Sequence, residues 1–282
     1  MPSAYLLVSH GSRDSRPQVA MERLSWLLSQ SQARTHNKLQ TFEPAMVGVP
    51  KSKGTEENYE LQQLESEVSS PLKLPRITNY ELPLVGTACL ELDPVALHEQ
   101  ITEFADRALK YGYNRIKIVP LFLLPGVHVM EDIPAEVAIA QKTLGERLKL
   151  ELKPHLGTHP GLIRLLANKQ ATTKAEAGIL LAHGSRRAGA KQPVEGIAQQ
   201  LGMLSAYWAV PPSLASRVQE LASAGHQQIG IVPYFLFAGG ITDAIAQSVE
   251  QLQGQFPAVE IRLAEPLGAS QELALLILDL VD

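Results

Sequence analysis

The chain has 282 residues, of which 45% are hydrophobic and 19% are charged, and this ordinary globular composition excludes a chain that is disordered throughout. The net charge of −4 and the 5% of aromatic residues give no basic or base-stacking surface for nucleic acid, and the single cysteine excludes an intramolecular disulfide framework. No apolar run reaches the roughly 18 residues of a membrane span, and the start lacks a basic signal-peptide region, so we expect a cytoplasmic protein with no membrane partner and no nucleic-acid partner.

Short apolar runs alternate with amphipathic stretches along the whole chain. The spacing of apolar residues predicts helices over 94–110 and 134–149, each with a proline near its start, where a missing N–H costs least. The expected strands are, in chain order, 5–8, 85–90, 116–119, 150–152, 179–182, 206–210, 229–232 and 259–263. This alternation predicts an α/β fold of the flavodoxin-like kind, with open, mostly parallel four-stranded sheets and helices on both faces.

An internal repeat divides the chain into two similar halves. Residues 6–13 recur as 179–186, and residues 112–123 recur as 225–236. Leu156-Gly157 recurs as Leu267-Gly268. Because the three markers keep the same order, we predict two homologous lobes, 1–173 and 177–282, joined by a polar linker at 169–176.

The first lobe is longer than the second, and its extra length falls at about 35–82. This stretch is rich in proline and in charges of both signs, so a solvated surface loop is expected, with a lid over a site as the alternative.

Three polar side chains follow the first three expected strands of the first lobe. His10 comes directly after the first strand, Glu91 lies just past the second, and His128 follows the third through a loop that contains Pro125-Gly126. Because ligands of open α/β sheets bind outside the carboxyl ends of the strands, we expect these side chains to share one crevice.

The repeat serves as an internal control on these residues. His10 is kept as His183, whereas Glu91 aligns with Ala209 and His128 with Ile241. A residue needed only for folding should tend to survive in both lobes, so we infer one active constellation, held by the first lobe, with the second lobe closing the cleft.

Other motifs are weaker candidates for a functional site than His10, Glu91 and His128. His155 and His159 have the i, i+4 spacing of metal ligands, but Gly157 and Pro160 argue against a regular helix across them. Neither a P-loop nor a Gly-x-Gly-x-x-Gly motif is present, so no nucleotide cofactor is expected.

At these residues the chain resembles the sirohydrochlorin chelatases of the CbiX/SirB family, in their long two-lobe form. The matching pieces are Ser9-His10-Gly11-Ser12-Arg13, Glu91-Leu-Asp-Pro94 and residues 119–128 with Asp132-Ile-Pro134. The resemblance covers both lobes apart from the insertion, and it implies a class II chelatase, a lyase that works without ATP. Short members of the family reach the same architecture as homodimers, so we expect this fused chain to be a monomer.

The resemblance implies that His10 and His128 handle the metal, with Glu91 assisting. Neutral imidazole binds Fe²⁺, Co²⁺ and Ni²⁺, and it titrates near neutrality, so it can also accept a pyrrole proton. No tightly bound cofactor is expected, because the divalent ion is a substrate. The sequence does not separate cobalt, which leads to cobalamin, from iron, which leads to siroheme, and nickel is a third choice.

Sirohydrochlorin is rich in carboxylates, which favour guanidinium groups and backbone N–H groups at helix starts. Ordinary solvated arginines at helix starts are the alternative. The expected substrate-binding residues, one set from each lobe, are Ser12, Arg13, Arg16, His183, Ser185 and Arg186.

A second function remains open at this point, that of a non-catalytic metal carrier or tetrapyrrole-binding protein on the same scaffold, because a fold alone does not establish catalysis.

Overall fold

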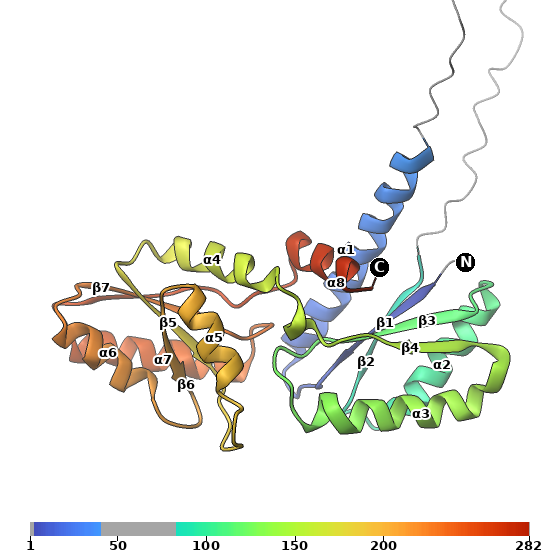
Figure 1. Ribbon diagram of the computed structural model, residues 1–282, viewed down its shortest axis with the longest axis horizontal. Coiled ribbons are helices and arrows are strands. Elements are labelled where there is room, and N and C mark those ends of the chain that lie inside the picture. The colour runs from blue at the N-terminus through green and yellow to red at the C-terminus, as the bar shows by residue number, and fades with distance from the viewer. Residues whose placement is uncertain (1–2, 41–82, 282) are drawn as a thin grey trace, which may run out of the picture.

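The computed structural model describes residues 3–40 and 83–281 (Figure 1). The insertion expected at 35–82 lies outside the described residues from 41 onward, so the choice between a surface loop and a lid stays a prediction. Residues 35–40 continue the first helix, α1 (Ser15–Gln40). No helix of the described residues is both long enough and apolar enough to cross a membrane.

The first lobe is built on a four-stranded parallel sheet of order β2-β1-β3-β4. Its most central strands, β1 and β3, are almost continuously buried, as expected for a parallel sheet with helices on both faces. The strands are β1 (Ala4–Ser9), β2 (Val85–Cys89), β3 (Arg115–Pro120) and β4 (Lys149–Leu152). Helices α2 (Leu97–Lys110) and α3 (Ile133–Leu144) pack together on one face and α1 lies on the other.

The second lobe repeats this sheet, in the order β6-β5-β7-β8. Its strands are β5 (Ala177–Ala182), β6 (Leu204–Tyr207), β7 (Gln228–Pro233) and β8 (Glu260–Leu263), and its helices include α5 (Gln192–Gln200), α6 (Leu214–Ser223) and α7 (Gly240–Gln255). The predicted fold class, two homologous α/β lobes with parallel four-stranded sheets, is confirmed.

The repeat extends to single backbone hydrogen bonds. The N–H of Glu91 donates to the carbonyl of His10, and the N–H of Ala209 donates to the carbonyl of His183, both at 2.9 Å. The alignment of Glu91 with Ala209 is therefore a structural equivalence.

Some expected element boundaries are wrong. The helix expected to run to residue 149 ends at Leu144, because Gly145 adopts a positive φ of 58° and a short 3-10 turn, η2 (Gly145–Arg147), follows. Lys149 belongs to β4. The expected linker is shorter than 169–176, because α4 (Leu162–Thr173) includes its first five residues.

The last helix of each repeat packs on the sheet of the other repeat. Helix α4, which ends the first repeat, lies against β7 of the second sheet. Helix α8 (Gln271–Val281), which ends the second repeat, packs on α1 and β3 of the first lobe (Figure 1). A boundary at 174–176 therefore separates the two sequence repeats, but each folded lobe includes a helix from the other repeat.

Three apolar cores hold these layers together. One lies between α2, α3 and the first sheet, and a second lies between α6, α7 and the second sheet. The third runs through both lobes and contains residues of α1, α4, α5 and α8 together with the inner faces of both sheets. This shared core joins the two lobes.

Candidate metal centre

The first sheet has its topological switch point between β1 and β3. From β1 the chain crosses to β2 on one side, and it returns to place β3 on the other side, so the carboxyl ends of β1 and β3 border a crevice. His10 directly follows β1 and Glu91 lies two residues past β2. His128 begins the π-helical turn η1 (His128–Asp132) that leads from β3 into α3.

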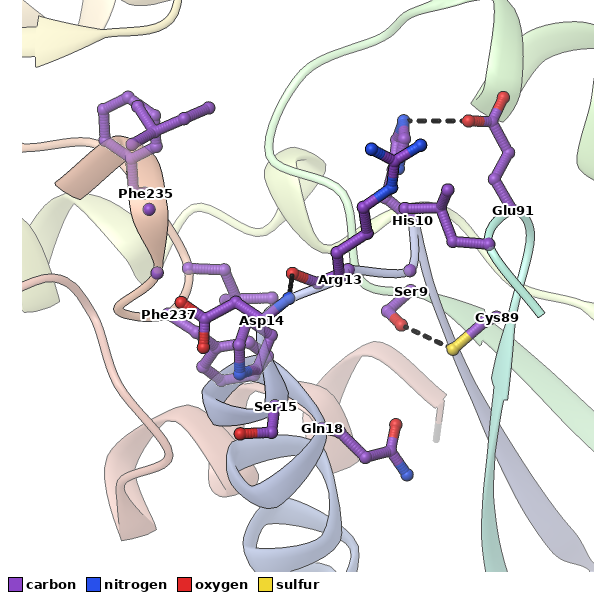
Figure 2. Close-up of a pocket in the computed structure, with 18 of the residues that line it drawn as sticks. Ser9, His10, Arg13, Asp14, Ser15, Gln18, Cys89, Glu91, Phe235 and Phe237 are labelled. Atoms are coloured by element: carbon purple, nitrogen blue, oxygen red, sulfur yellow. Dashed lines mark hydrogen bonds and ion pairs between the residues drawn. The ribbon is translucent and has the colours of Figure 1, made fainter. Parts of the chain in front are cut away.

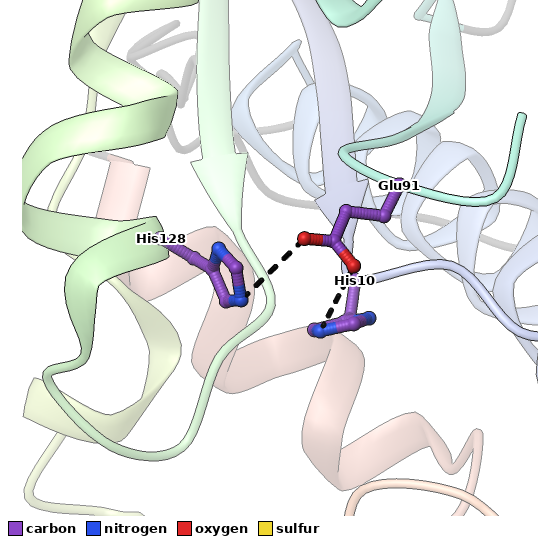
Figure 3. Close-up of side chains that lie close together, drawn as sticks. All are labelled: His10, Glu91 and His128. Atoms are coloured by element: carbon purple, nitrogen blue, oxygen red, sulfur yellow. Dashed lines mark ion pairs between the residues drawn. The ribbon is translucent and has the colours of Figure 1, made fainter.

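The three side chains meet at this crevice (Figure 3). Nε2 of His10 lies 3.8 Å from one carboxylate oxygen of Glu91, and Nε2 of His128 lies 3.8 Å from the other. The imidazole rings stand edge to face, with centroids 4.9 Å apart. One candidate ligand atom from each residue falls within 4.8 Å of the other two, so the donor set can face a single metal ion.

Gly11 brings His10 and Glu91 together. Its φ is +99°, a conformation that side chains disfavour, and a Cβ at this position would lie only 2.0 Å from the carbonyl oxygen of Glu91. The loop after β1 can therefore approach the loop after β2 closely only because residue 11 is glycine.

His128 is held by a carboxylate of its own turn. Its Nδ1 lies 2.8 Å from Oδ2 of Asp132, an i, i+4 contact across η1. Because a carboxylate only accepts, Nδ1 is the donor of this contact and Nε2 is directed toward Glu91 and His10. The centroid of the Phe122 ring lies 6.4 Å from the centroid of each imidazole, and this ring forms the apolar side of the cluster.

The cluster lies at the edge of a cavity of about 620 Å³ between the lobes (Figure 2). The first lobe contributes the loop from Ser9 to Ser15 and the segment that begins at Glu91, and the second lobe contributes Phe235, Phe237 and the start of α7. His128 is not among the described residues of the wall, and it borders the cavity through its contacts with Glu91 and His10.

An ion-pair bridge joins the lobes beside this cavity. The guanidinium of Arg16 contacts Asp14, its neighbour on the first lobe, and Asp243 in the first turn of α7 on the second lobe. Hydrogen bonds from Arg16 lower the pKa of Asp14 to about 2 and also lower the pKa of Asp243. Both carboxylates are therefore charged at neutral pH.

A buried tyrosine makes a second contact between the lobes. Tyr234, directly after β7, donates from its hydroxyl to the carbonyl oxygen of Leu123 at 3.2 Å, and burial raises its pKa. The loop that carries His128 is thus tied to the second lobe.

Comparison with known proteins shows the family to which this chain belongs. The sequence profile of one family, CbiX, matches residues 78–173 and again residues 177–282. The chain belongs to the CbiX family.

Two curated relatives come from Priestia megaterium. One, a sirohydrochlorin ferrochelatase, is 25% identical over 70% of this chain and 76% of its own length. The other, a sirohydrochlorin cobaltochelatase, is 24% identical over 67% of this chain and 66% of its own length. Among solved structures, SirB from Bacillus subtilis with Fe³⁺ matches with a TM-score of 0.67 and 20% identity, over 100% of this chain and 94% of that one. The structural match supports the CbiX fold.

Within the two CbiX repeats, the substrate-binding residues expected from the sequence lie in different places. Ser12 and Arg13 line the interlobe cavity. Arg16 is not among the described residues that line it, because its guanidinium is held by Asp14 and Asp243. A substrate-binding role for Arg16 stays a prediction.

The second expected set does not flank the same cavity. Ser185 and Arg186 line a separate cavity of about 440 Å³ on the second lobe. His183 is exposed and is among the described lining residues of neither cavity. The structure thus places the two sets at different cavities, and a substrate-binding role for the second set stays a prediction.

The low-ranked histidines have structural partners. Nδ1 of His155 lies 3.0 Å from the carbonyl oxygen of Phe122, and His159 accepts a hydrogen bond from the N–H of Gly161 and contacts Asp279. Both are buried, and each supports a chain turn in the CbiX fold.

Sequence reasoning missed two features of the site. The spacing of His128 and Asp132 was available as a signal, because i, i+4 partners face each other on a helical turn. The bridge from Arg16 to Asp243 carried no sequence signal, since 227 residues separate the partners.

Proposed function

We propose that this chain inserts a divalent metal ion, Co²⁺ or Fe²⁺, into sirohydrochlorin without ATP. The observation that carries the proposal is the convergence of His10, Glu91 and His128, from three separate loops, at the edge of a cavity between two CbiX lobes. The names of the curated relatives support the reaction class and the tetrapyrrole, and they divide between iron and cobalt.

The geometry of the donor set suits an ion that must be released. Metal–ligand distances of about 2.0–2.2 Å place two ligand atoms of one ion at most about 4.4 Å apart. The separations of 3.8 Å fit this limit, and the widest separation, within 4.8 Å, needs only a small rotation of a half-exposed side chain. With two imidazoles and one carboxylate, the ion keeps open positions for the pyrrole nitrogens.

Metal insertion also requires that two pyrrole protons leave the macrocycle. The imidazoles of His10 and His128 and the carboxylate of Glu91 lie at this edge of the cavity and can accept them. Which histidine binds the ion and which accepts a proton is left open.

The cavity offers complementary surfaces for a macrocycle with acidic substituents. Its volume of about 620 Å³ lies in the usual range for small-molecule sites, roughly 300–1,000 Å³, and it is partly open to solvent. Phe235 and Phe237 supply an apolar wall for the ring, while Ser12 and Arg13 supply hydrogen-bond donors for carboxylates. A monomeric state and a cytoplasmic location stay predictions.

Turnover tests the proposal. Sirohydrochlorin in excess is mixed anaerobically with the protein and either Co²⁺ or Fe²⁺, and the absorbance spectrum of the macrocycle is followed. We expect conversion of many equivalents per protein. A shift that stops at one equivalent would instead establish a carrier or a tetrapyrrole-binding protein.

The variant His128→Ala tests the site itself. We expect the insertion rate to fall more than about 100-fold, since loss of a group that only supports a ligand already costs about 10–100-fold. His226→Ala is the matched control. His226 lies just before the amino end of β7, whereas the candidate site lies at the carboxyl ends of the strands. An unchanged rate in His128→Ala would exclude the assignment.

A further inference from the structure

The second lobe has a cavity of its own, lined by the equivalents of residues that line the first-lobe side of the interlobe cavity. It has a volume of about 440 Å³ and lies at the carboxyl ends of β5 and β6. The residues of its wall that the argument uses are Ser185, Arg186, Arg187, Lys191, Ala209 and Pro211. The backbone hydrogen bond from Ala209 to His183 shows that these loops superpose on those that carry His10 and Glu91.

The repeat reverses the charge of this place. In the first lobe, Asp14, Glu91 and Asp93 all line the interlobe cavity. The equivalent positions of the second lobe hold Arg187, Ala209 and Pro211. Three carboxylates are thus replaced by one cation and two uncharged residues on the same backbone. An acidic wall, which includes the candidate metal ligand Glu91, has become a basic one.

The cations of this wall are available to a ligand. Arg186 and Arg187 are exposed, and among the described residues no carboxylate pairs with either guanidinium. The ammonium of Lys191 donates to the carbonyl oxygen of Pro211 at 2.6 Å and lies 5.3 Å from the centre of the Tyr207 ring, which fixes it at the wall with further donors free. The acidic Glu195 lies near Tyr207 and is not among the described lining residues.

We propose that this second-lobe cavity binds an oxyanion, a phosphate or carboxylate group, through Arg187, Arg186 and Lys191. A planar guanidinium presents paired N–H donors to two oxygens of such a group, and an ammonium adds a point charge. The two cavities share no described lining residue, so phosphate binding at this site can be measured separately from the proposed metal insertion.

The substitution Arg187→Asp tests the site, because it restores the charge that the first lobe has at Asp14. The probe is radiolabelled inorganic phosphate, measured by equilibrium dialysis against the full chain at constant ionic strength. We expect saturable binding of one phosphate that Arg187→Asp weakens by about tenfold or more, as loss of a charged hydrogen-bonding partner does. Arg187→Gln should weaken it less, without adding a negative charge.

The control is Arg164→Asp, which changes the net charge equally at an exposed arginine that lines a different cavity. Absence of phosphate binding, or equal weakening by Arg164→Asp, would overturn the proposal. Trp208 directly precedes Ala209, which lines the cavity. In a Trp26→Phe background Trp208 is the one remaining tryptophan, so a change of its fluorescence on adding phosphate places the bound phosphate near this cavity.

A competition arm identifies the source of the oxyanion. Displacement of phosphate by sirohydrochlorin assigns the site to the carboxylates of the macrocycle, whereas phosphate that stays bound under saturating sirohydrochlorin assigns it to a separate small anion. Both results support the oxyanion site. Because phosphate binding is measured without metal insertion, failure of this site and failure of the proposed function are distinguishable.

Discussion

Asp132 gives His128 a support that the described residues do not give to His10. The carboxylate fixes the tautomer and the orientation of the His128 ring, whereas the described contacts of the His10 ring are with Glu91, Phe122 and His128. A metal ligand held in this way loses less rotational freedom when the ion binds.

Asp132→Asn should therefore weaken metal use more than tetrapyrrole binding. We expect the KM for the metal ion to rise about 10-fold or more while the KM for sirohydrochlorin stays near its original value, because the carboxylate acts through His128. Steady-state kinetics with each substrate varied in turn measures the split. Glu131→Ala, an exposed neighbour in the same turn, is the control, and a rise in both KM values alike would argue against a positioning role.

At the residue scale, much of the site was predictable. His10, Glu91 and His128 each follow a strand that an apolar run reveals, and the carboxyl ends of parallel strands share one edge. The cavity that Ser185 and Arg186 line was not predictable from the sequence. A repeat shows which strand a residue follows, but it does not show which cavity the loop after that strand borders.

Among the helices and strands, α4 and α8 are the ones that pack on the sheet of the other repeat, and both contribute to the core shared by the two lobes. Helix α8 buries most of its length, and its apolar residues contact α1 and β3 of the other repeat. The strands and several helices could be predicted from apolar periodicity. The partner of α8 could not, since an apolar run shows that a helix is buried and does not show against which sheet.

Shortening a buried side chain of α8 should destabilise the whole protein. Ile277 is completely buried in the shared core, so we expect Ile277→Ala to lower the free energy of unfolding by about 2–5 kcal/mol. Urea unfolding followed by circular dichroism measures the loss. Leu275→Ala is the control, because Leu275 is 52% exposed on the same helix and should change stability by at most about 0.5 kcal/mol. Equal losses in both variants would contradict the packing described for α8.

For the whole molecule, the bridge between Arg16, Asp14 and Asp243 fastens the two lobes beside the cavity. The internal repeat was sufficient to predict that two lobes exist. Their mutual arrangement depends on contacts between residues far apart in the chain, such as this bridge and the bond from Tyr234 to Leu123, which no local pattern encodes.

Arg16→Ala should lower the melting temperature in a pH-dependent way. The pKa of Asp14 is about 2 in the folded protein and 3.8 without its partner, so the stabilisation is complete above about pH 4 and is lost as the pH falls through about 2. The difference in Tm between the parent protein and Arg16→Ala should therefore be present at pH 6 and disappear near pH 2. Because Arg16 and Asp243 are exposed and Asp14 is only partly buried, we expect a small difference.

Arg23→Ala, an exposed arginine on the same helix, serves as the control. A difference in Tm that stays constant from pH 6 to pH 2 would show that the carboxylates are not its source.

The placement of α4 and α8 also determines what happens when the chain is cut. A protease nick at residues 174–176 would break the covalent link between the repeats, yet each fragment would still have its terminal helix seated on the sheet of the other. The fragments would therefore stay interlocked as a heterodimer. Either fragment made alone would leave part of one face of its own sheet uncovered and one apolar helix without a sheet to pack on, so co-expression is the expected route to obtain both in folded form.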